Sequence, residues 1–129
     1  MALPKRIMVG GAYYKGYKLT VNASAGDYVL DMILSAKACA ANGISITPDA
    51  YGEGDYFKLE HLDASNEVQA LLISTVYNIG KNVTQLFDFP AFELLDAGHK
   101  MRLTYTNVAG TAMSVYTILE RVTTKSGGV

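Results

Sequence analysis

Apolar and polar residues alternate along much of this chain. In residues 101–106, the side chains of Met101, Leu103 and Tyr105 would face one way and the intervening polar ones the other, which is the period of a half-buried β-strand. Strands at such spacings, separated by turns, predict an all-β fold, an antiparallel β-sandwich of jelly-roll-like type. The same reasoning predicts about eight strands, at 18–21, 27–35, 44–47, 56–62, 68–79, 83–89, 101–106 and 113–122.

Glycine marks the turns between several of these strands. Gly26, Gly54 and Gly98 each stand shortly before an alternating segment. Glycine accepts the positive φ that reverses a chain, so we expect all three in turns. Asn42-Gly43 is a frequent turn dipeptide and predicts a further turn. Residues 36–41 are good helix formers, but so short a segment allows at most one helical turn.

Two predicted strands are apolar on both faces, which a lone β-sandwich does not require. The segments 68–79 and 113–122 each carry large apolar residues at consecutive positions, and a strand of this kind is covered on both sides. Tyrosine is also enriched at interfaces. We therefore expect an interface with another subunit. The candidate interface residues are Tyr13, Tyr14, Tyr17, Leu71, Ile73, Tyr77, Tyr116 and Ile118.

Length and composition fit a single domain. The chain has 129 residues, of which half are hydrophobic and 18% charged, enough to form one core. Gly10-Gly11 ends a segment without periodicity, so residues 1–11 are expected to form an N-terminal arm and residues 123–129 a flexible tail. One cysteine allows no internal disulfide. No apolar run of signal-peptide length precedes Gly10, so a cytosolic site of synthesis is expected.

Charge and motifs exclude several classes of function. A net charge of −1 gives no field that would attract nucleic acid, and the apolar runs are far shorter than the roughly 20 residues of a membrane-spanning helix. His61 and His99 lack the spacing of a zinc site, and no serine elbow or phosphate-binding loop is present. We expect no enzyme activity, no cofactor and no metal.

The loop between the third and fourth predicted strands is acidic. Asp49, Glu53 and Asp55 stand close together among glycines, and calcium prefers carboxylate oxygens on flexible loops. The spacing does not match an EF-hand, so a solvated acidic turn is the favoured interpretation. Tyr51 and Tyr56, at loops or strand ends, leave a carbohydrate-binding module as the alternative function.

The whole pattern resembles a type of protein. A short chain without cysteine pairs or signal peptide, with an irregular N-terminal segment and two-faced apolar strands, is similar to the small capsid-decorating or other accessory virion proteins of tailed bacteriophages. The resemblance implies a structural protein that is made in the host cytoplasm and resides in the virion. It would form a homo-oligomer and bind a major capsid protein or another virion part. The resemblance is by general type, so no functional residue is carried over.

Overall fold

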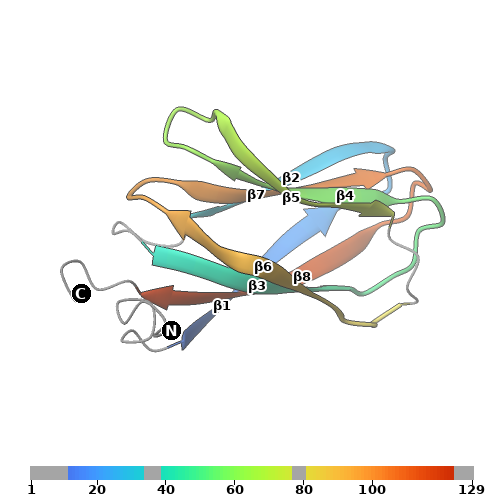
Figure 1. Ribbon diagram of the computed structural model, residues 1–129. Helices are drawn as coiled ribbons and strands as arrows, with labels where there is room; N and C mark the ends of the chain where they lie inside the picture. Colours follow the sequence, from blue (N-terminus) through green and yellow to red (C-terminus); the bar gives the residue numbers. More distant parts are fainter. Residues whose placement is uncertain (1–11, 34–38, 77–80, 124–129) are drawn as a thin grey trace.

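The computed structural model describes residues 12–33, 39–76 and 81–123. These residues form eight antiparallel strands in two four-stranded sheets that lie face to face (Figure 1). The described chain contains no helix. The strands are β1 (Ala12–Val21), β2 (Gly26–Ile33), β3 (Cys39–Pro48), β4 (Tyr56–Leu62), β5 (Val68–Val76), β6 (Gln85–Leu95), β7 (Lys100–Asn107) and β8 (Met113–Thr123).

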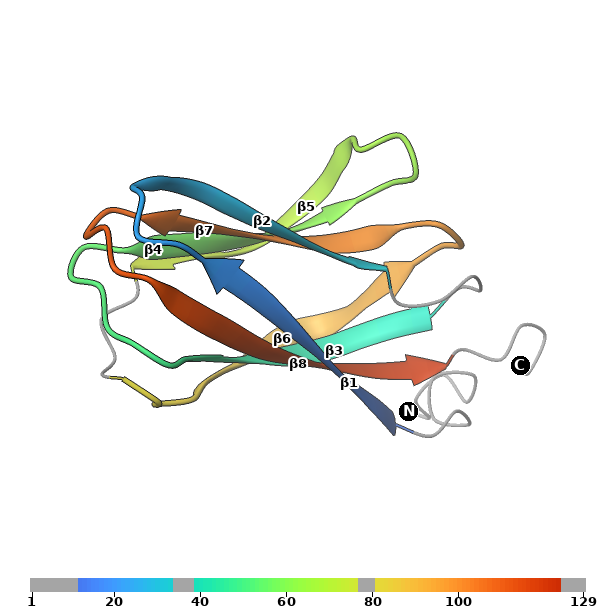
Figure 2. The same ribbon diagram turned by 180° about the vertical axis from the view of Figure 1, so that it is seen from behind.

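The strand order is that of a jelly roll. One sheet runs β1-β8-β3-β6 and the other β2-β7-β4-β5. Each strand is therefore hydrogen-bonded to the strand that lies equally far from the opposite end of the series: β1 to β8, β2 to β7, β3 to β6 and β4 to β5. This is the double-sheet arrangement of eight-stranded jelly rolls. The view from behind shows β1 at one edge of the first sheet, beside β8 (Figure 2). The predicted all-β sandwich is confirmed.

The core lies between the sheets and is filled by alternate residues of each strand. Met101, Leu103 and Tyr105 of β7 are fully buried, as their alternation predicts. Phe57 of β4 meets the ring of Phe87 of β6 edge to face, with centroids 5.7 Å apart, so the two sheets are joined by an aromatic contact.

The glycine turns follow the prediction at three positions. Gly26, Gly54 and Gly98 have φ values of 144°, 85° and 82°, a region that residues with a Cβ rarely adopt. Each of these glycines lies at or just before the start of a strand, so the expectation of three similar strand starts is confirmed.

The predicted turn at Asn42-Gly43 is wrong. Both residues lie inside β3, where the register shifts between Ala41 and Gly43 as in a β-bulge. A Cβ on Gly43 would lie 2.7 Å from the carbonyl oxygen of Phe87, so glycine serves here for the close approach of two strands. Pairing with β6 and β8 on both sides overrides the local preference of the dipeptide.

The predicted helical turn is also wrong where it can be compared. Cys39, Ala40 and Ala41 begin β3, because their backbones pair with both β6 and β8. Residues 36–38 lie outside the described chain, as do the whole of the predicted N-terminal arm and all of the predicted C-terminal tail except Thr123. Thr123, assigned to the tail, is the last residue of β8.

A β-bulge corrects the prediction for β5. Leu59 pairs with Ile73 while Glu60 pairs with Leu71, so Leu72 is the extra residue of the bulge. The bulge breaks the alternation, and Leu71 and Ile73 end on opposite faces. Leu71 is exposed, whereas Ile73 packs in the core. The prediction that both lie on one outer face is wrong.

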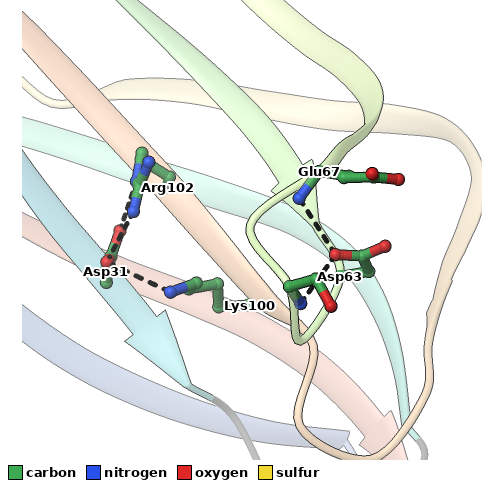
Figure 3. A network of polar contacts seen from close by, with 6 residues as sticks. Asp31, Asp63, Glu67, Lys100 and Arg102 are labelled. Carbon is green, nitrogen blue, oxygen red and sulfur yellow. Dashed lines mark hydrogen bonds and ion pairs between the residues drawn. The ribbon is translucent and has the colours of Figure 1, made fainter.

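The outer face of the second sheet carries a cluster of charged residues. Arg102 donates two hydrogen bonds to Asp31, from Nε to Oδ1 at 2.7 Å and from Nη2 to Oδ2 at 3.0 Å. Lys100 Nζ lies 3.5 Å from the same carboxylate (Figure 3).

In the turn before β5, Asp63 accepts hydrogen bonds from the backbone amides of Ser65 and Glu67 (Figure 3), and these hydrogen bonds fix the turn locally.

The Asp31 cluster predicts a pH dependence. The hydrogen bonds from Arg102 hold the pKa of Asp31 below its usual range. A lowered pKa means that the stabilisation is present near neutral pH and is lost as the pH falls through the folded-state pKa. Asp31→Asn should therefore destabilise the protein at neutral pH, and the difference from the natural chain should shrink in acid. Urea unfolding as a function of pH measures this, with the exposed Asp96→Asn as control. A difference that stays constant into acid would contradict the assignment.

Candidate assembly surface

The outer face of the β1-β8-β3-β6 sheet carries large apolar side chains. Strand register places Ile118 of β8 and Leu86 of β6 in one row, on either side of Ser45. Ile118 is 48% exposed and Leu86 is 75% exposed. Tyr14 of β1 and Tyr116 of β8 lie on the same face and are 69% and 46% exposed. These four residues, Tyr14, Leu86, Tyr116 and Ile118, are called the apolar sheet face below.

The two outer faces of the sandwich differ in character. On the second sheet, the row that contains Asp31 and Arg102 continues to Glu60 of β4. Exposed apolar residues also occur on that sheet, but they are spread over three strands: Val29 on β2, Tyr56 on β4, and Val68 and Leu71 on β5. β7, which carries Arg102, lies between β2 and β4. Scattered apolar residues are normal on protein surfaces, whereas a contiguous group marks a contact surface.

A hollow of about 260 Å³ lies on the apolar sheet face. It follows β3, where Gly43 has no side chain and Ser45 has a small one, between the larger side chains of the neighbouring strands. Its walls combine apolar groups with two carboxylates. They include Tyr14, Ile118 and Glu120 on one side and Leu86 and Asp88 on the other.

Of the two carboxylates that line the hollow, Glu120 is the one that accepts hydrogen bonds from side chains of the described residues. Glu120 accepts a hydrogen bond from the Tyr14 hydroxyl at 3.0 Å and another from Asn42 Nδ2 at 2.6 Å. The hydrogen bond to Glu120, together with its negative charge, raises the pKa of Tyr14. Within the described ranges, neither Glu120 nor Asp88 forms an ion pair. The hollow therefore has two carboxylates without a balancing cation.

The structure brings together three of the predicted interface residues. Tyr14, Tyr116 and Ile118 share the apolar sheet face, whereas Leu71 lies on the other sheet. Tyr17 is half-buried and packs against the core. Ile73 is buried, so its prediction as a surface residue is wrong. Tyr77 and the side chain of Tyr13 are outside the described part of the structure.

Leu86 and Asp88 belong to this surface but were not predicted. In the segment 83–89, Leu86 alternates with the inward-facing Phe87 and Phe89. Leu86 occupies a position at which an alternating strand with one exposed face would carry a polar residue, and this is the sequence signal that would have identified it.

The acidic loop is a structural anchor. Asp55 is fully buried and accepts hydrogen bonds from the Tyr105 hydroxyl at 2.8 Å and from the amides of Val108 and Ala109 at 2.7 and 3.0 Å. Asp49 accepts one from the Ser114 amide at 2.7 Å. The interpretation of a solvated acidic turn is wrong for Asp55, because its buried carboxylate accepts hydrogen bonds from protein groups.

The two histidines bind each other. His61 Nε2 and His99 Nδ1 are 2.8 Å apart, and His61 is buried. One ring must supply the proton and the other a lone pair, so at least one ring is neutral while this bond exists. Sequence reasoning did not predict this pair, because the partners are distant in sequence. Among the residues described, no group of three or more His, Cys, Asp or Glu is placed to hold a metal ion.

Searches of known proteins give limited information. No protein-family model and no curated protein matches the sequence. Among solved structures, the chain is similar to infectious bursal disease virus of the Gt strain, with 10% identity and a TM-score of 0.37 over 88% of this chain and 33% of that one. It is also similar to the VP2 subviral particle of that virus, with 7% identity and a TM-score of 0.38 over 88% and 32%.

The chain spans about a third of the length of the viral chains, and TM-scores this low carry no functional argument. The described residues include no helix that is long and apolar enough to cross a membrane.

Proposed function

We propose that this protein is a non-enzymatic structural β-sandwich that assembles with copies of itself on a larger protein assembly, such as a virion. The observation that carries the proposal is the apolar sheet face, four large exposed side chains on one sheet, of which Tyr14, Leu86 and Ile118 line one hollow. A contiguous apolar group of this kind is typical of a surface that another protein covers. The virion location rests on the resemblance by type that the sequence shows.

Self-association tests the proposal directly. The natural chain should form a multimer at micromolar concentration in analytical ultracentrifugation. Ile118→Lys should weaken this association by about tenfold to a hundredfold, because burial of an isoleucine side chain contributes about 1.5–3 kcal/mol. Its unfolding midpoint should change little, since the side chain is half exposed in the subunit.

Val29→Lys is the matched control for this test. Val29 is also an exposed β-branched residue, on the outer face of the other sheet, and its replacement should leave the multimer intact. A natural chain that remains monomeric, or equal effects of the two lysine variants, would overturn the proposal.

Sugar binding is the second candidate, and one feature favours it. A hollow of about 200 Å³ on the second sheet is lined by Tyr56 together with polar residues that include Asp27, Lys58 and Thr106. An aromatic ring beside hydrogen-bonding groups suits a carbohydrate. Tyr51 is exposed but does not line this hollow. A glycan array that finds a ligand for the natural chain but not for Tyr56→Ala would favour this function.

A further inference from the structure

The hollow on the apolar sheet face has a definite chemical preference. Its walls offer the exposed side chains of Leu86 and Ile118, and the carboxylates of Asp88 and Glu120 lie in the same lining. No ion pair balances these carboxylates within the described residues. The fitting ligand is therefore a peptide segment that combines apolar residues with cations, and arginine is well suited because its planar guanidinium binds carboxylates through two hydrogen bonds.

One segment of this chain has that chemistry. Lys5-Arg6 is the only pair of adjacent basic residues in the sequence, and it stands between Leu3 and the apolar residues 7–9. The segment precedes β1 and lies outside the described structure. An extended chain of eleven residues spans up to about 36 Å, which is sufficient to reach an adjacent subunit.

Strand register favours the segment of a neighbour over the chain's own. Tyr14 lines the hollow, and Ala12 lies further out, paired with Val122 of β8. Ala12, the first described residue, therefore lies beyond the end of the hollow. A segment that is attached to Ala12 would have to reverse the direction of β1 to enter the hollow of its own subunit, whereas the segment of a second copy can enter without this reversal.

We propose that residues 3–9 of one copy bind in the hollow of a neighbouring copy, with Lys5 and Arg6 at Asp88 and Glu120 and the flanking apolar residues against Leu86 and Ile118. This inference rests on the proposed self-assembly. It adds an asymmetric contact, in which each subunit places its own segment in the hollow of one neighbour and binds the segment of another in its own hollow.

Charge reversal in the full chain tests the contact. Lys5→Glu/Arg6→Glu reverses the segment, and Asp88→Lys/Glu120→Lys reverses the hollow. Each double variant should assemble at least about tenfold more weakly than the natural chain, because attractive pairs become repulsive ones. An equimolar mixture of the two variants should assemble again, because each segment then faces a hollow of opposite charge. Lys58→Glu/Lys81→Glu, which reverses two exposed lysines elsewhere, should leave assembly unchanged.

The outcomes separate this inference from the proposed function. A natural multimer that is indifferent to both reversals would overturn the segment contact and leave the proposed function standing. A third outcome is that assembly recovers in a single chain that carries all four changes but not in the mixture of the two double variants. This outcome would place the segment in the hollow of its own subunit and overturn the contact between copies. A natural chain that does not assemble at all would overturn both.

Discussion

Replacing Asp55 with alanine is expected to lower the free energy of unfolding by about 3–5 kcal/mol. The carboxylate is fully buried and accepts three hydrogen bonds, two of them from the amides of Val108 and Ala109 in the connection between β7 and β8. Without it, the Tyr105 hydroxyl and both amides lose the hydrogen bonds to this carboxylate, and breaking a network around a buried group is costly. The loop from β3 to β4 would also lose its attachment to that connection.

Urea unfolding measures the effect, and Asp49→Ala is the control. Asp49 is partly exposed and accepts one side-chain hydrogen bond, from the Ser114 amide, so its loss should cost only about 1 kcal/mol. Tyr105→Phe removes a single donor to Asp55 and should also cost less than Asp55→Ala. If Asp55→Ala and Asp49→Ala are equally mild, the carboxylate does not anchor the loop.

Phe57→Ala is the second large effect, an expected loss of about 3–5 kcal/mol. Phe57 is buried between the sheets and contacts Phe87 edge to face, so its removal leaves a cavity and breaks an aromatic contact across the sandwich. The neighbouring Tyr56 lies on the opposite face of the same strand and is about half exposed. Tyr56→Ala should therefore cost less than about 1 kcal/mol.

Comparison of Phe57→Ala with Tyr56→Ala tests whether these neighbouring residues lie on opposite faces of β4. Both variants remove an aromatic ring from β4, and they differ in the side of the sheet from which the ring is removed. Equal losses, measured by thermal or urea unfolding, would contradict the assignment of Phe57 to the core and Tyr56 to the surface.

Local pattern predicts most of the sandwich. The alternation in β7 correctly places Met101, Leu103 and Tyr105 inside, because a strand with one buried face must alternate. For the same reason, the apolar residues at both phases of β8 predict that Tyr116 and Ile118 face outward. With Tyr14, three of the four residues of the apolar sheet face are among those that the sequence predicts.

The features that sequence reasoning missed depend on pairing between distant strands. Asn42-Gly43 prefers a turn locally, but β6 and β8 hold it in a strand. The bulge at Leu72 arises from the register with β4. Asp55 finds its donors around Val108, and His61 finds His99. No window of neighbouring residues contains these contacts, so periodicity and turn preferences cannot reveal them.

The pairing of the first strand with the last has a consequence for biosynthesis. β8 lies between β1 and β3, and β7 lies between β2 and β4, so each sheet has one of the last two strands in its interior. A chain still emerging from the ribosome lacks both, and its earlier strands have no complete sheet to join. Pairing over such sequence distances is also slow. Neither sheet can therefore be completed before β7 and β8 have left the ribosome, and the earlier strands must be kept from aggregating until then.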